Sequence, residues 1–255
     1  MAKLPISVFI ITLNEEKNIA RALKSVEFAE EIIVVDSGST DATIEIVKSF
    51  GIEPVHNDWP GYSKQKQFAM DLCQHEWVLN IDADEEVNSA LVERFVQVME
   101  SDDYASVRCL RHDVFMGSAL SPLTRLARNT RFYKKSKAVF DDTRLVHERV
   151  IVSGKELLVS EHITHYGYPG IELFTDKKNK YSSLKAKEKY LKGKKFSYLK
   201  LFLIFPLVFF QEWLFKRKIF SGVPGLVLSI IQAHYAFIKE AKLYELNAKD
   251  NKDND

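Results

Sequence analysis

Short apolar runs alternate through the first hundred residues with stretches in which apolar residues recur at every third or fourth position. The runs are rich in β-branched residues, which predicts buried strands over 6–12, 32–35, 53–56, 77–81 and 104–110. The stretches between them predict helices over about 17–26, 40–50, 62–73 and 89–99. This alternation predicts an α/β fold whose parallel sheet is covered by helices on both faces.

Polar residues at the predicted boundaries indicate where the helices begin. Asn14 is expected to cap the first helix, Asp41 the second, and Asn88 or Ser89 the fourth. Side chains of this kind accept hydrogen bonds from the free N–H groups of a first helical turn. Ligands of a parallel sheet bind outside the carboxyl ends of its strands, so polar residues that directly follow a strand are the candidates for a site.

The rest of the chain has a different pattern. Residues 112–165 contain short strand-like segments and turns, which predict mixed or antiparallel strands that complete the site. Beyond residue 176 the chain is helical and basic, with thirteen Lys and Arg but only three acidic residues in 176–220. The resulting charge of +10 predicts a cationic face on this segment. The whole chain carries only +1, so no nucleic acid partner is expected.

Cysteine usage and the amino terminus indicate the compartment. Cys73 and Cys109 are too few for a disulfide framework or a zinc site and fit a reducing environment. The apolar run over 6–11 is too short for a signal peptide and is followed by Asn14, Glu15 and Glu16. We therefore interpret the run as a strand and expect a cytoplasmic protein.

Three carboxylates follow predicted strands. Asp82 and Asp84 are one residue apart, so both can reach one divalent cation, and magnesium and manganese prefer such oxygen ligands. The same spacing fits a polar turn equally well. Asp36 closes the preceding strand, where its carboxylate can accept from a nucleobase N–H or a ribose hydroxyl. Ser37 to Ser39 then allow a tight turn.

Three motifs occur in order: Phe-Ile-Ile-Thr-Leu-Asn-Glu-Glu at 9–16, Val-Val-Asp-Ser-Gly-Ser-Thr-Asp at 34–41 and Asn-Ile-Asp-Ala-Asp-Glu at 80–85. Together they resemble the inverting family-2 glycosyltransferases of the GT-A fold. Trp59 to Tyr62, Gln65-Lys66 and Leu145 to Glu148 are similar to the lipopolysaccharide-core glucosyltransferase subgroup. The resemblance implies a Rossmann-like mixed sheet flanked by helices over residues 1–168. A helical, basic extension over 169–248 and a disordered tail over 249–255 would follow.

The resemblance also implies the chemistry. A hexose, with glucose from UDP-glucose as the expected donor, would be moved with inversion to an inner-core lipopolysaccharide sugar or another lipid-linked saccharide. A divalent cation, Mn²⁺ or Mg²⁺, would assist the leaving diphosphate. The implied residues are Glu148 as catalytic base, Thr12, Asn14, Glu15, Asp36, Lys66 and Asp82 at the nucleotide, and Asp84, Asp82 and His165 at the metal.

Simpler interpretations stand beside these roles. Glu148 could form an ordinary ion pair, His165 could be a hydrogen-bonded structural residue, and Lys66 could be a solvated helix residue. A sugar-1-phosphate nucleotidyltransferase is a rival function, but it needs a Gly-rich phosphate loop that residues 13–16 lack. A non-catalytic scaffold that docks on membranes is the other rival.

The carboxyl-terminal third contains two apolar segments. Residues 201–210 are too short to span a bilayer, and 219–238 are long enough but interrupted by polar residues, Gly and Pro. Aromatic residues next to Lys216, Arg217 and Lys218 favour contact with the inner face of the cytoplasmic membrane. Packing on the catalytic domain and a true membrane span are the alternatives. The oligomeric state is not predicted.

Overall fold

The computed structural model describes residues 3–141, 149–168 and 170–253, with side chains up to residue 248. The chain forms two compact units. The first contains the chain up to His112 together with Ala127–Gly167, and the second contains Asp113–Leu126 and the chain from Tyr168 onward. The second unit therefore includes a segment that lies between two strands of the first.

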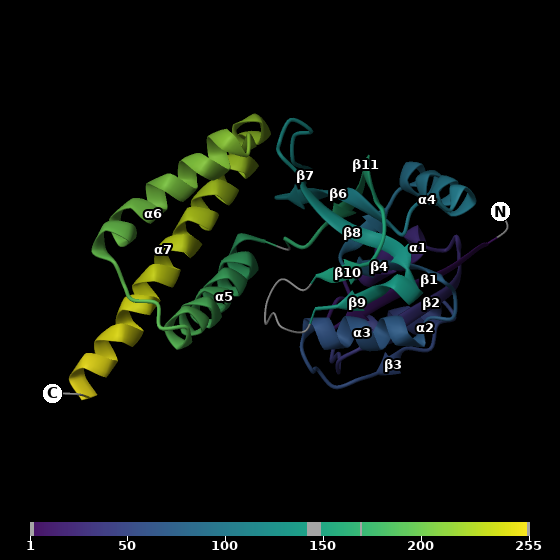
Figure 1. Cartoon of the computed structure of the whole chain (residues 1–255), viewed down its shortest axis with the longest axis horizontal. Coiled ribbons are helices and arrows are strands. Elements are labelled where there is room, and N and C mark those ends of the chain that lie inside the picture. Colours follow the sequence, from purple (N-terminus) through teal and green to yellow (C-terminus); the bar gives the residue numbers. More distant parts are fainter. Residues whose placement is uncertain (1–2, 142–148, 169, 254–255) are drawn as a thin grey trace. The chain divides into compact units, whose positions relative to one another are not determined.

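Most strands of the first unit form one mixed sheet, and β9 and β10 form a separate two-stranded sheet (Figure 1). Within the described residues the strand order of the mixed sheet is β3-β2-β1-β4-β8-β6-β11-β5. β1 pairs in parallel with β2 and β4, whereas β8 runs antiparallel to β4 and β6. The sheet confirms the predicted α/β class, and its strands are β1 (Leu4–Thr12), β2 (Ala29–Asp36), β3 (Val55–His56), β4 (Trp77–Asp82), β5 (Glu85–Val87), β6 (Ser106–Phe115), β8 (Ala127–Lys134) and β11 (Glu156–His165).

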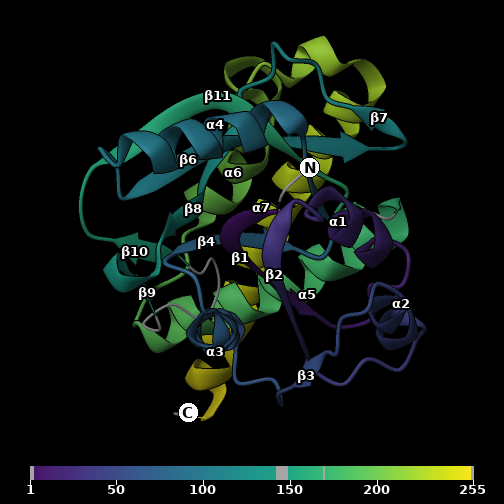
Figure 2. The same ribbon diagram turned by 90° about the vertical axis from the view of Figure 1, so that its right-hand side faces the viewer.

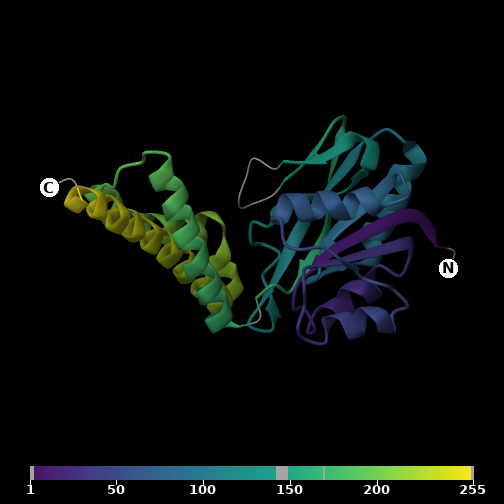
Figure 3. The same ribbon diagram turned by 90° about the horizontal axis from the view of Figure 1, so that it is seen from below.

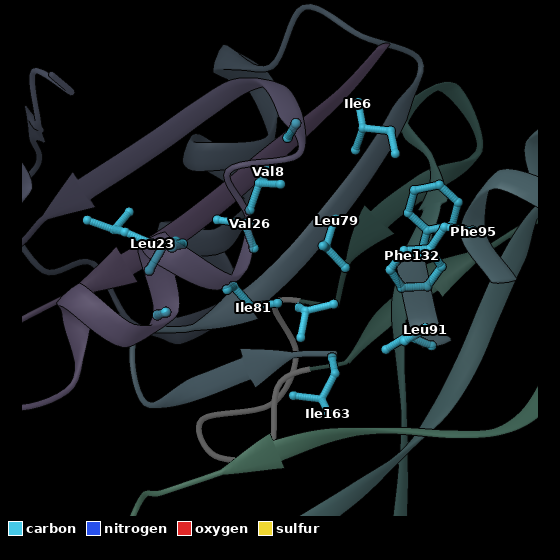
Figure 4. Packing of buried hydrophobic residues seen from close by; sticks show 14 of the residues in the cluster. Ile6, Val8, Leu23, Val26, Leu79, Ile81, Leu91, Phe95, Phe132 and Ile163 are labelled. Carbon is cyan, nitrogen blue, oxygen red and sulfur yellow. The ribbon is translucent and has the colours of Figure 1, made fainter. Parts of the chain in front are cut away.

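Helices α1 (Ile19–Ser25), α2 (Thr43–Ser49) and α4 (Ser89–Ser101) cover one face of this sheet. Side chains at alternate positions of β1 and β4 point toward that face, as a period of two requires. Figure 4 shows the resulting cluster, in which Phe95 and Phe132 stack at a ring separation of 4.3 Å. The cluster fixes the sheet from which the site residues project.

The opposite face is covered by helix α3 (Tyr62–Leu72) and by the hairpin of β9 (Ala138–Phe140) and β10 (Val150–Val152). Figure 2 shows α3, β9 and β10 near one another at the lower left of the view. Phe9 of β1 contacts Phe140 edge to face at 6.3 Å between ring centroids. This second core holds α3 and the hairpin over β4 and β8, where Lys66 and Arg131 enter the site described below.

Two predicted helix caps are wrong. Asn14 lies before α1 in the left-handed region, with φ of 56°, and its side chain accepts from the Thr40 N–H at 2.8 Å. Asp41 lies one residue before the cap of α2, Ala42, although its carboxylate accepts from the Thr43 N–H at 3.0 Å. The Asp41 carboxylate also accepts from the Glu16 N–H at 3.2 Å, so both side chains join the loop after β1 to the loop after β2. These contacts between distant residues outweigh local capping. Asn88 caps α4 as predicted.

The second unit consists of helices α5 (Ile171–Leu191), α6 (Tyr198–Phe210) and α7 (Gly222–Asp253), two short helical turns over Gln211–Phe215 and Lys218–Ser221, and a hairpin of β7 (Ser118–Ala119) with the end of β6. Figures 1 and 3 show α5 and α6 alongside α7. Phe115 and Leu120 of the hairpin pack against Phe174, Leu228 and Ile231. This apolar cluster assigns residues 113–126 to the helical unit.

Two features of these helices bear on the sequence interpretation. α6 has no buried residue, and Phe202 is 77% exposed. Two segments, Tyr198–Phe215 and Lys218–Ala248, are apolar and long enough to cross a membrane by composition alone. α7 continues to Asp253, into the segment 249–255 that the sequence predicts to be disordered.

Candidate active site

The ends of three strands bring the predicted nucleotide residues together. β1 lies between β2 and β4, and their registers place Thr12 beside Asp36 and Ile11 beside Asp82. Because all three strands are parallel, their carboxyl ends meet at one edge of the sheet. Thr12, Asp36 and Asp82 therefore lie at the same edge of the sheet.

Asp36 organises the turn that follows β2. One carboxylate oxygen accepts from the N–H groups of Gly38 and Ser39 at 2.7 and 2.9 Å, and the other accepts from the Ser39 hydroxyl at 2.5 Å. Gly38 has φ of +95°, which other residues rarely adopt. The Asn14 N–H donates to the Ser39 hydroxyl at 2.9 Å, so this turn is tied to the loop after β1.

Thr12 and Glu15 complete this edge. The Thr12 hydroxyl oxygen is buried and has no hydrogen-bond partner among the described residues. Burying a polar atom without a partner costs free energy, which makes this hydroxyl a candidate contact for a ligand. The Glu15 carboxylate accepts from the side-chain amide of Asn18 at 2.9 Å, and its N–H donates to the Thr43 hydroxyl at 2.8 Å.

Asp82 is held from two sides by cations. Lys66, whose side chain is 2% exposed, donates to one oxygen at 2.8 Å, and Arg131 donates to the other at 2.7 Å. Arg131 also donates to Glu85 at 2.5 Å and to the side-chain amide oxygen Oδ1 of Asn80 at 3.1 Å. Burial alone would raise the pKa of Asp82, but Arg131 and Lys66 more than offset this effect and hold it well below its usual range. Asp82 is therefore ionised.

Sequence reasoning missed Arg131. The register of β6 against β8 pairs Val107 with Phe132 and Arg108 with Thr130, so Arg131 is the extra residue of a β-bulge. A bulge turns its extra side chain away from the regular alternation, and here it directs the guanidinium at Asp82. A shift in pairing between distant strands leaves no mark in the local sequence.

Asp84 and His165, named here the candidate cation pair, lie together next to this network. The Asp84 carboxylate is 3.5 Å from Nε2 of His165, and the Tyr166 N–H donates to the Asp84 carbonyl oxygen at 2.8 Å. β11 reaches this position because it pairs antiparallel with β5, with His165 opposite Glu85. The distant His165 therefore lies beside Asp84.

Gly167 allows this close approach. A Cβ atom at this position would collide with the His165 ring and with the Asp84 carboxylate oxygen. The carboxylate oxygen is a ligand that Mn²⁺ and Mg²⁺ prefer, whereas the imidazole nitrogen suits a transition metal better than Mg²⁺. Among the described residues no group of three or more His, Cys, Asp and Glu side chains is placed to hold a metal. The remaining ligands would have to come from a substrate or water.

Glu148 lies outside the described residues, which resume at Arg149. The same holds for Leu145, Val146 and His147 of the motif that precedes it.

The chain is similar to known glycosyltransferases. The model of a family described as Glycosyl transferase family 2 matches residues 7–150. The lipopolysaccharide core biosynthesis glycosyltransferase LpsC of Rhizobium meliloti is 34% identical over 96% of this chain and 94% of its own length. An uncharacterized glycosyltransferase of Rickettsia typhi is 37% identical over 96% of this chain and 88% of its own.

Among solved structures, the crystal structure of S. aureus TarS is similar over 94% of this chain and 54% of its own. The TM-score is 0.50 and the sequence identity is 18%, so the likeness concerns the fold.

Proposed function

Since the chain belongs to glycosyltransferase family 2 and is a nucleotide-sugar-dependent glycosyltransferase, we propose that it transfers glucose from UDP-glucose to a saccharide of the lipopolysaccharide inner core. The observation that carries this proposal is the meeting of Thr12, Asp36 and Asp82 at one sheet edge beside the candidate cation pair. The acceptor class is taken from LpsC, which is similar over nearly its whole length.

The nucleotide would lie against the ends of β1, β2 and β4. Asp36, fixed by three hydrogen bonds, presents a rigid acceptor edge to the uracil or ribose, and the unsatisfied Thr12 hydroxyl offers a further contact. Asn14 holds the loop that faces them. Lys66 and Arg131 keep Asp82 charged and fixed, so its role is to orient the ribose.

The candidate cation pair would hold the divalent cation. Both oxygens of Asp82 already accept from cations, which favours Asp84 and His165 as the protein ligands. When bound, the cation would neutralise charge that develops on the diphosphate as it leaves. His165 can bind only when its Nε2 is neutral, so cation binding should weaken at low pH.

Glu148 is the proposed base. It takes the proton of the acceptor hydroxyl while that oxygen bonds to the anomeric carbon, and the bond from this carbon to the diphosphate oxygen breaks. UDP leaves with the electron pair. One in-line displacement inverts the anomeric configuration, so an α-linked donor gives a β-glycoside.

The test is UDP release from UDP-glucose with Mn²⁺ or Mg²⁺ and a lipopolysaccharide-core acceptor. We expect Asp84→Ala to abolish release and Glu148→Gln to lower it by roughly a hundredfold or more, the usual contribution of a general base. Glu93→Gln, an exchange at an exposed position of α4, is the matched control. Unchanged release in Asp84→Ala would contradict the proposal.

The acceptor class also suggests contact with the inner face of the cytoplasmic membrane. The exposed apolar surface of α6 supports this contact, with Leu199 70% and Leu207 62% exposed. Lys194 and Lys195 precede this surface and Lys216, Arg217 and Lys218 follow it, and clusters of this kind attract anionic lipid. The protein would then be cytoplasmic and peripheral.

Cosedimentation with vesicles tests this contact. We expect binding to vesicles with anionic lipid and weaker binding to neutral ones, and loss of binding in Phe202→Ser/Leu207→Ser. Leu158→Ser, which replaces an apolar residue of the first unit that is 57% exposed, should bind like the wild type. Equal binding by the double variant would refute membrane contact through α6.

A further inference from the structure

A cationic cavity of about 460 Å³ opens beside Asp82 in the first unit. Its walls come from strands β4, β6 and β8, from α3, and from the hairpin of β9 and β10. Its size falls in the range of small-molecule sites, which is about 300–1,000 Å³. The cationic side chains that line it are Lys66, Arg108, Arg111, Arg128, Arg131 and Arg149.

Some of these cations are neutralised within the protein. Lys66 and Arg131 hold Asp82, Arg131 also holds Glu85, and Arg108 pairs with Glu156 at 3.2 Å. These contacts involve structural carboxylates and leave little charge for a ligand.

Arg128 and Arg149 differ from Lys66, Arg108 and Arg131. Arg128 donates to the carbonyl oxygen of Val159 at 3.5 Å, and neither residue forms an ion pair with any carboxylate in the described part of the chain. Both are exposed. Two guanidinium groups that face a cavity with other cations, and have no carboxylate of their own, are arranged to receive an anion.

Two buried donors provide a second, independent sign. Nε of Arg131 and Nδ2 of Asn80 are buried, and among the described residues neither has a hydrogen-bond partner. Arg131 is 6% exposed and Asn80 3%, and both line the cavity. Unsatisfied buried donors are rare in folded proteins, which points to a ligand or water on this wall.

Of the residues proposed to bind the nucleotide, only Lys66 and Asp82 line the cavity. None of Thr12, Asp36 and Asp84 lines it. The diphosphate, which carries the negative charge of UDP-glucose, must instead meet the candidate cation pair. The unpaired arginines are therefore available to the second substrate.

We propose that this cavity binds an anionic group, a phosphate or carboxylate, carried by the acceptor saccharide. The proposal rests on the proposed function for the identity of the two substrates. Arg128 and Arg149 form ion pairs with the anionic group, so the cavity binds negatively charged saccharides more tightly than neutral ones. Arg149 directly follows Glu148 in the sequence, so acceptor recognition and proton transfer would be carried by neighbouring residues.

Calorimetric titration of the full-length protein tests the site. The protein is first loaded with UDP and Mn²⁺, then titrated with glucose 6-phosphate or with glucose. We expect glucose 6-phosphate to bind and glucose not to bind at the same concentrations. Arg128→Gln/Arg149→Gln should weaken glucose 6-phosphate binding about tenfold to a hundredfold, since hydrogen bonds to charged groups are strong. Arg125→Gln, an exposed arginine that does not line the cavity, is the control.

Three results would overturn the inference. One is equal binding of glucose and glucose 6-phosphate, and another is an unchanged affinity in the double variant. The third is a preference for UDP-glucuronate over UDP-glucose that the double variant loses, because the cavity would then recognise the donor sugar. Binding of UDP and Mn²⁺ without any sugar is measured separately, and its failure would contradict the proposed function instead.

Discussion

Arg131→Met tests the charge network under Asp82 most directly. The substitution removes a buried guanidinium that donates to three side chains: Asn80, Asp82 and Glu85. Asp82 keeps Lys66 as its partner. The side chain of Glu85 is fully buried, and Arg131 is the cation that pairs with it in the described residues. The cost of the substitution therefore concentrates on Glu85.

The magnitude follows from that carboxylate. Burial already raises the pKa of Glu85 above its ordinary value of 4.5 in the wild type, although Arg131 opposes this rise. Without Arg131, Glu85 would take up a proton at pH 7, which costs at most about 3.4 kcal/mol, because each unit between the pH and the ordinary pKa is worth about 1.4 kcal/mol. The lost hydrogen bond to Asn80 adds about 1 kcal/mol. We therefore expect Arg131→Met to lower the free energy of unfolding by up to about 4 kcal/mol at pH 7. At pH 5 the loss should shrink by more than half, because protonating Glu85 is then cheap.

Urea unfolding followed by the fluorescence of Trp77 measures this change, since the indole stacks on Phe132, next to the bulge, at 4.6 Å. Arg131→Met/Glu85→Gln is the matched variant. Its neutral amide can still accept from the Asp82 N–H, as Glu85 does at 3.0 Å, so most of the lost stability should return. A loss below about 1 kcal/mol in Arg131→Met, or no recovery in the double variant, would refute this account.

Three further outcomes are expected. Because the folded-state pKa of Asp82 is lowered, its contribution to stability is present above its ordinary pKa of 3.8 and is lost as the pH falls below it. The urea midpoints of the wild type and Asp82→Asn should therefore converge as the pH falls from 5 to 3. A difference between the two midpoints that does not change with pH would contradict this. Burial raises the pKa of Cys73 and Cys109 to about 12, so neither thiol should react with iodoacetamide at pH 8 until the protein is unfolded, and mass spectrometry of the native protein would reveal any exception. Gly167→Ala should separate the candidate cation pair and weaken Mn²⁺-dependent UDP binding at least tenfold with little change in stability, whereas Gly170→Ala, whose Cβ meets no atom within 4 Å, should bind normally.

The sequence allowed the polar edge at the carboxyl ends of β1, β2 and β4 to be predicted because its residues follow buried strands. Apolar runs that end in Thr12, Asp36 and Asp82 identify both the strands and their polar termini, and parallel pairing brings those termini together. His165 required the family resemblance, since its place depends on the antiparallel pairing of β11 with β5. Roles that depend on local pattern were therefore predictable, and those that depend on distant pairing were not.

Arg131 and the cap residues show the limit of such reasoning. The bulge that directs Arg131 at Asp82 is a property of two strands whose paired residues on either side of it lie 25 and 22 positions apart. Asn14 looks like a helix cap in isolation, but its side chain accepts from the N–H of Thr40, 26 residues later. In both cases a contact between distant segments outweighs the local preference, as tertiary context often does.

The segment 113–126 decides how this protein could be shortened. It leaves the sheet after β6, buries Phe115 and Leu120 among the carboxyl-terminal helices, and returns as β8. Ending the chain after Gly167 would remove the helices that bury Phe115 and Leu120, and the exposed apolar side chains would favour aggregation. β6 and β8 are antiparallel neighbours, so a tight two-residue turn could replace the whole excursion. A minimal donor-binding fragment therefore demands two excisions, one internal and one terminal.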